Sequence, residues 1–477
     1  MSQPAATLRF AEKRELILDG AARQFNRRGI KAGTLTEVAA SVGLATNSLT
    51  YYYRKKEDLV CACLMRSIEA LNGVIADAGC QAPPGDLAGR VAAVVQGFVA
   101  MMAAIAEQRR PALIFFGDMR ALPQPQAAPV FAAYEDMYRR LRTLLHGGAC
   151  PAGAPGQPLP PVPPLPPAGG PARRTLNART HLLLSQMLWS RAWLGRYESS
   201  DYPRVASAMV DLLLHGLAAP GQAWPPAAPG GAAPPGDIVP MLARPAADAD
   251  RPAAPATPAT PATPGNPGNP GNPGNPGNPG NPDDAAAAPD ELREAYLRTA
   301  TRLVNDHGVG GASVERIAAT LALTKGSFYH HHDTKHALID ECFERSFALV
   351  RGAQLAALAG PGNGWQRLLA AALPLVRLQT SAQGPLLRLT AWTELPGALR
   401  WQKYSTMNRL GERYAAMVVD GLVDGSLRLV DPAVAAQMVS GLINALAEAE
   451  HWLPGEGPAP LDELLARPML LGLLARP

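Results

Sequence analysis

Two stretches of this chain decide its fold: GLATNSLTYYYRKKEDL at residues 43–59 and ALTKGSFYHHHDTKHAL at residues 322–338. When the chain is aligned with itself at an offset of 279 positions, residues 14–60 match residues 293–339 without a gap. Identical pairs include Arg14 and Arg293, Leu18 and Leu297, Ala21 and Ala300, Gly29 and Gly308, Ala39 and Ala318, Ala40 and Ala319, Leu44 and Leu323, Ser48 and Ser327, Lys56 and Lys335, and Leu59 and Leu338. A self-match of this length indicates a tandem duplication.

The first copy has the spacing of a helix-turn-helix. Apolar residues recur at helical spacing up to Gly29, which predicts a first helix with a glycine cap. Thr34 and Glu37 have the pattern of a capping box, which predicts a short second helix ended by Gly43. A third short helix is predicted over residues 46–52, and a longer fourth helix follows. Two short helices around a tight turn are typical of DNA-binding proteins.

The third predicted helix carries small hydrogen-bonding groups and aromatic rings, and no acidic residue. Its candidate DNA-binding residues are Thr46, Asn47, Ser48, Thr50, Tyr51 and Tyr52. Such groups can contact base edges and thymine methyls in the major groove. Lys55 and Lys56 come at the start of the next helix, where their charge opposes the helix dipole, so they indicate an anionic partner such as phosphate.

The second copy repeats this layout with weaker chemistry. Ser313 begins its second helix, and Thr324 begins its third. The candidate residues on that third helix are Lys325, Gly326, Ser327, Tyr329, His330 and His331. Ala322 replaces the turn glycine; if the turn needs a left-handed residue, this costs about 1 kcal/mol.

The charge of the two copies differs. Residues 9–58 hold ten basic and six acidic side chains, which leaves +4, as large as the net charge of the whole chain. Residues 290–340 hold six basic and seven acidic side chains, which leaves −1 with neutral histidines. Because phosphate contacts dominate DNA affinity, the first copy is expected to bind DNA more strongly.

These motifs resemble the TetR (tetracycline-repressor) family of bacterial regulators, whose heads end in Gly-hydrophobic-Ser/Thr-x-x-x-Leu-Tyr-x-His/Tyr-Phe-x-x-Lys-x-x-Leu. The resemblance implies an all-α fold with two repeats, each a helix-turn-helix head followed by a helical body for effector binding and dimerisation. In repeat 1 it implies base contacts by Thr46, Ser48, Thr50 and Tyr51 and phosphate contacts by Thr36, Tyr52 and Lys56. In repeat 2 the matching residues are Lys325, Ser327, Tyr329 and His330, with His331 and Lys335.

This chain departs from the family pattern at several of these positions. Thr50 stands where the family usually has Tyr, so repeat 1 is expected to read a different base step. Glu315 stands at the position of Thr36, so that phosphate contact is expected to be lost in repeat 2. Tyr53 and His332 replace the usual Phe, and this is expected to weaken the packing of the hydrophobic core of each head.

Composition divides the rest of the chain. Residues 150–171 and 219–289 are rich in Pro and Gly, which predicts a loop and a flexible linker. The expected domains are head 1 (residues 8–60), body 1 (61–218, with the Pro-rich loop 150–171), the linker (219–289), head 2 (290–340) and body 2 (341–477). Residues 173–218 and 431–453 resemble the family's last helices. A coil of about 70 residues spans roughly 45–50 Å, enough to join one body to the next head.

These features predict a cytoplasmic transcriptional regulator, a ligand-responsive repressor whose repeats pair as a single-chain pseudo-dimer on an asymmetric double-stranded DNA operator. The expected effector is small and apolar, and neither a cofactor nor a membrane is expected. One alternative is that only head 1 binds DNA and two chains pair. Another is a protein-interaction module, which repeat 2 fits better than repeat 1.

Other classes of function find little support. No G-x-S-x-G elbow, Gly-Lys phosphate loop or paired zinc ligands indicate an enzyme. The histidines around His330 to His336 and the proline run PLPPVPPLPP are weak signals of a zinc site and of peptide docking. The apolar stretch from Val91 to Ala106 is too short for a membrane span and predicts a buried helix.

The cysteines and tryptophans allow two further readings. The chain has five cysteines and no secretory leader is expected, so reduced cytosolic thiols are expected; Cys61 and Cys63 as a redox switch is the weaker interpretation. Four tryptophans could line an effector pocket, although aromatic residues on helices are more often core: Trp189, Trp193, Trp392 and Trp401.

Overall fold

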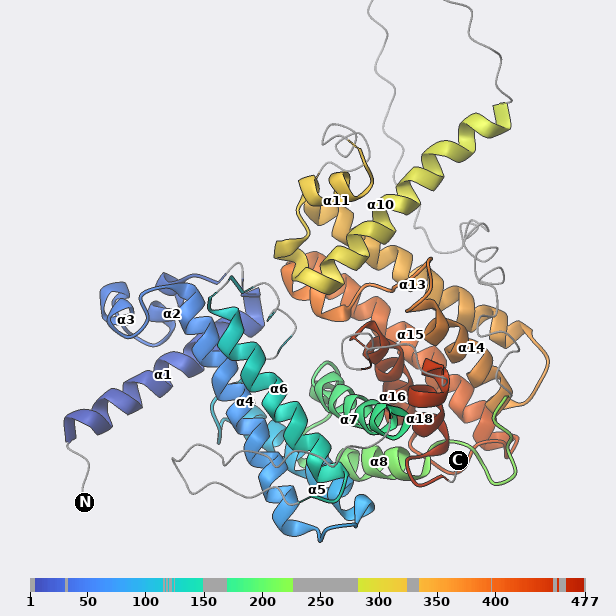
Figure 1. Ribbon diagram of the computed structural model, residues 1–477, viewed down its shortest axis with the longest axis horizontal. Coiled ribbons are helices and arrows are strands. Elements are labelled where there is room, and N and C mark those ends of the chain that lie inside the picture. The colour runs from blue at the N-terminus through green and yellow to red at the C-terminus, as the bar shows by residue number, and fades with distance from the viewer. Residues whose placement is uncertain are drawn as a thin grey trace, which may run out of the picture.

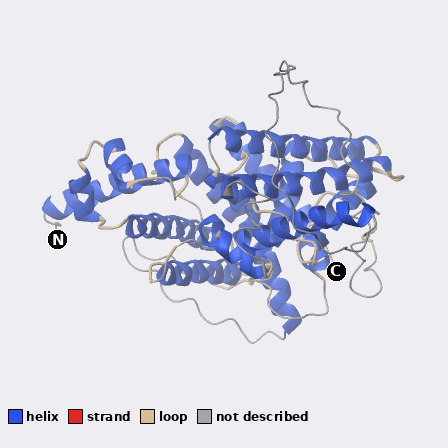
Figure 2. Cartoon of the chain, turned by 90° about the horizontal axis from the view of Figure 1, so that it is seen from above, coloured by secondary structure: helices blue, strands red, loops and turns tan. Residues whose placement is uncertain are grey.

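The structure is a computed structural model. It describes residues 5–30, 33–114, 116, 119, 122–123, 125–148, 170–225, 282–323, 334–395, 397–448, 453 and 460–475. The described residues form helices and no strand; one isolated bridge pairs Ala218 with Leu427 (Figure 2). The all-α fold that the family resemblance implies is confirmed.

Each repeat begins with the helices of a head. In repeat 1 these are α1 (Ala5–Arg28), α2 (Leu35–Ser41) and α3 (Thr46–Tyr52), and in repeat 2 the described ones are α10 (Pro282–Gly311) and α11 (Val314–Thr320). Gly29 ends α1 with φ 81°, and the matching Gly308 breaks α10 with φ 69°. Left-handed backbone costs glycine little, so the same glycine ends the first helix of both heads.

The predicted starts of the second helices are confirmed. The Thr34 hydroxyl accepts from the Glu37 amide, and the Glu37 carboxylate accepts from the Thr34 amide, which completes a capping box. In repeat 2, the Ser313 hydroxyl accepts from the Arg316 amide. Both caps satisfy amides that have no partner within the helix.

Each head is followed by a helical body. Body 1 contains α4 (Lys56–Gln81), α5 (Leu87–Ala106), α6 (Ala127–Leu145), α7 (Gly170–Ser190), η2 (Leu194–Arg196), η3 (Ser199–Asp201) and α8 (Tyr202–His215). Body 2 contains α13 (Lys335–Ala359), α14 (Gly364–Leu378), η5 (Leu389–Glu394), α15 (Gly397–Val423), α16 (Pro432–Ala445), η6 (Leu446–Glu448), η7 (Asp462–Ala466) and α18 (Arg467–Leu471). In both bodies the first helix packs against the next two.

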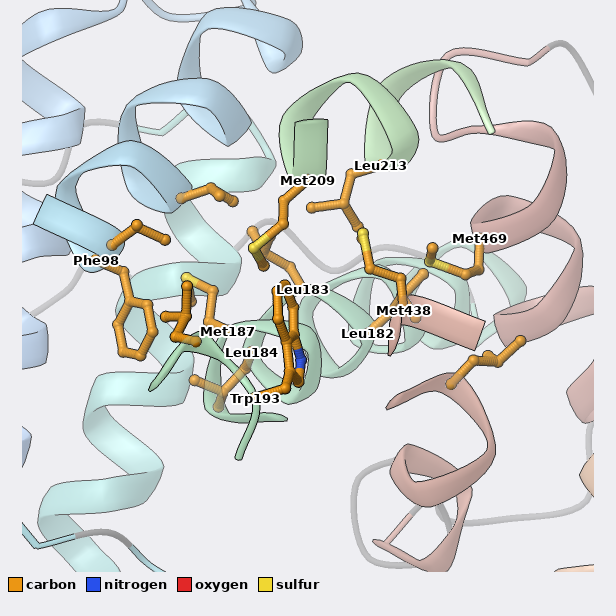
Figure 3. Packing of buried hydrophobic residues seen from close by; sticks show 14 of the residues in the cluster. Phe98, Leu182, Leu183, Leu184, Met187, Trp193, Met209, Leu213, Met438 and Met469 are labelled. Atoms are coloured by element: carbon orange, nitrogen blue, oxygen red, sulfur yellow. The ribbon is translucent and has the colours of Figure 1, made fainter. Parts of the chain in front are cut away.

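The two bodies meet in a seam made by α7 and α8 of repeat 1 and by α16, η7 and α18 of repeat 2 (Figure 1). Buried side chains from both repeats share one hydrophobic core there, and Figure 3 shows Met438 and Met469 beside Leu182 and Leu213. A core that crosses between repeats resembles the interior of one domain rather than a contact between two.

Hydrogen bonds cross the seam at its centre. The Gln186 amide donates to the Met438 carbonyl over 2.9 Å, and the Trp189 indole N–H donates to the Gln437 carbonyl over 2.8 Å. The His181 imidazole Nε2 donates to the Ala445 carbonyl over 2.7 Å. These bonds satisfy N–H donors of side chains that lie in the seam.

Main-chain hydrogen bonds join the last residues of the two repeats. The Leu217 amide donates to the Leu470 carbonyl over 2.8 Å, and the Leu473 amide donates to the Leu213 carbonyl over 2.8 Å. Gly216 and Gly472 lie at this crossing with positive φ, and a β-carbon on Gly216 would lie 2.3 Å from the carbonyl carbon of Leu471. Glycine is needed there for both its conformation and its size.

Two helices could cross a membrane by length and composition alone. Among the described residues these are α4 and α5, and 56% of the most apolar window of each is buried inside the fold. Core helices of soluble proteins pass the same test, and both helices contribute to the shared core.

The linker expected from composition differs from the structure at both ends. Helix α10 begins at Pro282, because proline is favoured in a first helical turn and the alanines at 285–288 are strong helix formers. At the other end, the Trp365 indole N–H donates to the Ala223 carbonyl over 3.1 Å and the Trp224 indole N–H to Glu463 over 2.7 Å. Residues 226–281 and most of the Pro-rich loop lie outside the described residues.

Candidate nucleic-acid interface

Head 1 contains the helix-turn-helix that the sequence predicts. Helices α2 and α3 pack together, and the turn between them has Gly43 at φ 69°. The Leu44 amide donates to the Ala39 carbonyl over 2.9 Å, which closes the turn. Leu49 is fully buried, so it fixes α3 on the head and turns the opposite face of the helix outward.

The outward face of α3 presents polar and aromatic groups. Asn47, Ser48 and Tyr51 are exposed and lie at helical spacing on one face. Thr46, Thr50 and Tyr52 are half-buried at its edges. The Thr50 hydroxyl donates to the Asn47 carbonyl over 2.9 Å, so its methyl group is the part best placed to contact a base. The face is suited to hydrogen bonding and to thymine methyls.

An aromatic cluster at the edge of this face was missed by sequence reasoning. Phe10 of α1 stacks on Tyr52 with ring centroids 4.8 Å apart and meets Tyr51 edge to face at 6.4 Å. Tyr51 remains 77% exposed. The matching position in repeat 2 is Pro289, which has no aromatic ring. The cluster therefore supports two candidate DNA-contacting residues in head 1.

The candidate phosphate contacts of head 1 surround α3. Thr36 on α2 is exposed, Lys56 is half-buried at the first position of α4, and Arg54 and Lys55 are exposed just before it. Tyr53, expected to soften the core, is buried, and its hydroxyl accepts from Arg14 Nε over 3.1 Å. Burial raises the pKa of Tyr53, and the bond to Arg14 opposes that rise. The hydroxyl group that Tyr53 has and Phe lacks therefore has a hydrogen-bond partner.

Head 2 is described only in part. The segment predicted to form its third helix lies outside the described residues, together with the candidates Lys325, Gly326, Ser327, Tyr329, His330 and His331. Glu315 is exposed on α11, as Thr36 is on α2. The Lys335 ammonium, the counterpart of Lys56, donates to the Val309 carbonyl within head 2.

Ala322 adopts the left-handed conformation that its position in the turn implies. Its φ is 55°, close to the 69° of Gly43, and residues other than glycine rarely occupy this region. Replacing Ala322 with Gly is therefore expected to stabilise head 2 by about 1 kcal/mol, and replacing Gly43 with Ala to destabilise head 1 by a similar amount. Hydrogen exchange of α11 and α2 measures both changes, and a loss of protection in α11 with Ala322→Gly would contradict the assignment.

The described residues give no support to a redox or metal site. Cys63 is buried, and burial raises its pKa to about 12, so its thiol stays protonated and unreactive near neutral pH. No group of three or more His, Cys, Asp and Glu side chains could hold a metal within this part of the chain. Of the candidate pocket tryptophans, Trp193 is 1% exposed in the core and Trp401 is 71% exposed.

Comparison with known proteins places both heads in one family. The family model described as "Bacterial regulatory proteins, tetR family" matches residues 17–63 and 297–342. A stretch of 63 residues is 36% identical to the HTH-type transcriptional dual regulator CecR of Shigella flexneri, covering 13% of this chain and 28% of that relative. The chain thus spans less than a third of this curated relative.

Two solved structures match part of the chain. One is the TetR family regulator PfmR from Thermus thermophilus, with 24% identity, a TM-score of 0.30, and 37% of this chain and 98% of that chain covered. The other is AibR in complex with isovaleryl coenzyme A and operator DNA, with 23% identity, a TM-score of 0.33, and 38% and 97% covered. The two family matches coincide with the two heads described above, so each repeat begins with a head that matches the tetR family of bacterial regulatory proteins.

Proposed function

We propose that the chain is a cytoplasmic, ligand-responsive transcriptional repressor that binds one double-stranded DNA operator with both heads. The observation that carries this proposal is the presence of two tetR-family heads in one polypeptide whose bodies share a buried core. Two heads on one chain can occupy two half-sites without a second subunit.

The seam supports an intramolecular pseudo-dimer. The last helices of each repeat face those of the other, and reciprocal main-chain bonds join Leu217 to Leu470 and Leu473 to Leu213. The surface formed by these last helices is therefore buried between the two repeats of one chain. Light scattering at micromolar concentration is expected to give particles of one chain, whereas particles of two or more chains only would favour intermolecular pairing.

The DNA-binding residues we propose are those of the outward face of α3 and its surroundings: Thr36, Thr46, Asn47, Ser48, Thr50, Tyr51, Tyr52 and Lys56 in head 1. Those we propose for head 2 are Lys325, Gly326, Ser327, Tyr329, His330, His331 and Lys335. Lys325 can donate to guanine, whereas Asn47 suits adenine. The operator is therefore proposed to have unequal half-sites.

Selection of bound sequences from a random DNA pool tests this directly. Two different half-sites at a fixed spacing are expected, and Lys325→Ala is expected to change base preference at one of them with a modest loss of affinity. A perfectly palindromic site, or no enriched site, would contradict the proposal.

We further propose that the bodies bind a small, apolar effector that releases the DNA. A ligand shifts an equilibrium between head arrangements only by its difference in affinity for the two states. A library of lipophilic metabolites, scored by thermal shift and by DNA release, tests this. Ligands that bind without changing DNA affinity would remove the sensor role.

A second candidate is a chain in which only head 1 binds DNA. Three observations favour it: head 2 has a charge of −1, Glu315 replaces Thr36, and Lys335 is bonded to the Val309 carbonyl. Footprinting discriminates the two, because this candidate predicts protection of a single half-site.

A further inference from the structure

In both repeats, residues at matching positions make the contacts between the head and the body. At the offset of 279, Asn26 corresponds to Asn305, Arg66 to Arg345 and Glu15 to Glu294. All six side chains make contacts of the same kind in the structure. Two copies of different sequence thus keep one arrangement where each head meets its body.

In repeat 1 the arrangement joins α1 and α4 to the segment after α5. The Asn26 side-chain amide donates to the Leu113 carbonyl over 2.9 Å. The Arg66 guanidinium pairs with Glu15 at 3.2 Å and also donates to the Ala112 carbonyl. Residues from head 1 and body 1 thus converge on the main chain at residues 112–113.

In repeat 2 the same contacts are more numerous and more buried. Asn305, 2% exposed, donates to the Leu386 carbonyl and accepts from the Arg388 amide, both over 2.9 Å. Arg345 pairs with Glu294 at 2.7 Å and donates to the Gln383 carbonyl over 2.7 Å. Head 2 therefore makes more contacts of this kind with its body than head 1 does, and its contacts are more buried.

We propose that Asn26 and Asn305, with Arg66 and Arg345, are positioning residues that fix the angle of each head on its body and so set the half-site spacing the chain accepts. This inference rests on the proposed function. The bodies share a buried core at the seam, so the contacts of each head with its own body, together with the Arg400 bond to the Arg27 carbonyl that joins body 2 to head 1, set the separation of the two recognition surfaces. Side-chain bonds to main-chain carbonyls give such a joint a defined direction.

The test uses the full chain and the operator it selects, with the spacer between half-sites lengthened or shortened by one or two base pairs. Asn26→Ala and Asn305→Ala are compared with Ser41→Ala and Thr320→Ala. The controls each remove one side-chain bond to a carbonyl, 2.8 Å long, that stays inside a head. They too occupy matching positions in the two repeats.

Wild-type protein is expected to prefer one spacing, and each asparagine variant to lower that preference about fivefold, the equivalent of about 1 kcal/mol for one hydrogen bond. The controls are expected to keep it. Asn26 is exposed, so Asn26→Ala is expected to remain folded even if the buried Asn305 does not tolerate alanine. An unchanged spacing preference in Asn26→Ala overturns this inference alone, whereas wild-type protein that selects no operator overturns the proposed function as well.

Discussion

Replacing Lys56 with alanine is expected to weaken operator binding about tenfold at low salt, and replacing Lys335 to weaken it less. Lys56 lies beside α3 in the head with a charge of +4. Lys335 lies in the head with a charge of −1, and its ammonium already donates to the Val309 carbonyl. Phosphate contacts depend on local positive charge, so the lysine of the head with a charge of +4 is expected to contribute more.

The salt dependence of binding separates this effect from general destabilisation. Each lost phosphate contact lowers the slope of log affinity against log salt by about 0.9, so Lys56→Ala is expected to lower it by about that amount. Thermal unfolding of both variants is the control, since Lys335→Ala removes a bond that holds head 2 together. Equal losses of affinity and equal slopes for the two variants would show that the heads are equivalent.

The heads were predictable from the sequence because their signals are local. The capping box at Thr34 and Glu37, the cap at Gly29 and the third helix at residues 46–52 each depend on neighbours within a few positions, and the structure confirms all three. Even the strained Ala322 follows from its alignment with Gly43. Helix ends and turns are the features that short-range rules describe best.

The seam and the head–body contacts were not predictable in this way. Asn26 donates to a carbonyl 87 positions further along the chain, and Trp189 to one 248 positions away. Helical periodicity identifies a buried face but does not say which partner covers it. The one available signal was the repeat itself, since Asn26 and Asn305 are identical at the offset that defines the duplication.

The linker shows how composition can mislead at a boundary. Its alanines at 285–288 were grouped with the surrounding Pro and Gly, yet helix α10 begins at Pro282. The Phe10 stack on Tyr51 and Tyr52 was missed for a different reason, because Phe10 lies outside the aligned repeat and only packing brings it to α3.

The largest loss of stability is expected from alanine at Gly216. Its β-carbon would lie 2.3 Å from the carbonyl carbon of Leu471 and 2.4 Å from the carbonyl oxygen of Leu470, and these are main-chain atoms that no side-chain rotation can move. Gly216 also has a φ of 67°. We expect the free energy of unfolding to fall by about 3–5 kcal/mol, from overpacking and strain together.

Gly221 provides the matched control for this substitution. It lies five residues further along with a φ of 88°, and a β-carbon there would have no atom within 4 Å. Gly221→Ala should therefore cost only the strain of a left-handed alanine, about 1 kcal/mol. Calorimetric unfolding of the full chain compares the two variants.

Because Gly216 lies where the last residues of both repeats cross, its alanine variant should also lose the preference for paired half-sites, while Gly221→Ala keeps it. Equal destabilisation by the two substitutions would mean that the repeats do not approach each other closely at this crossing.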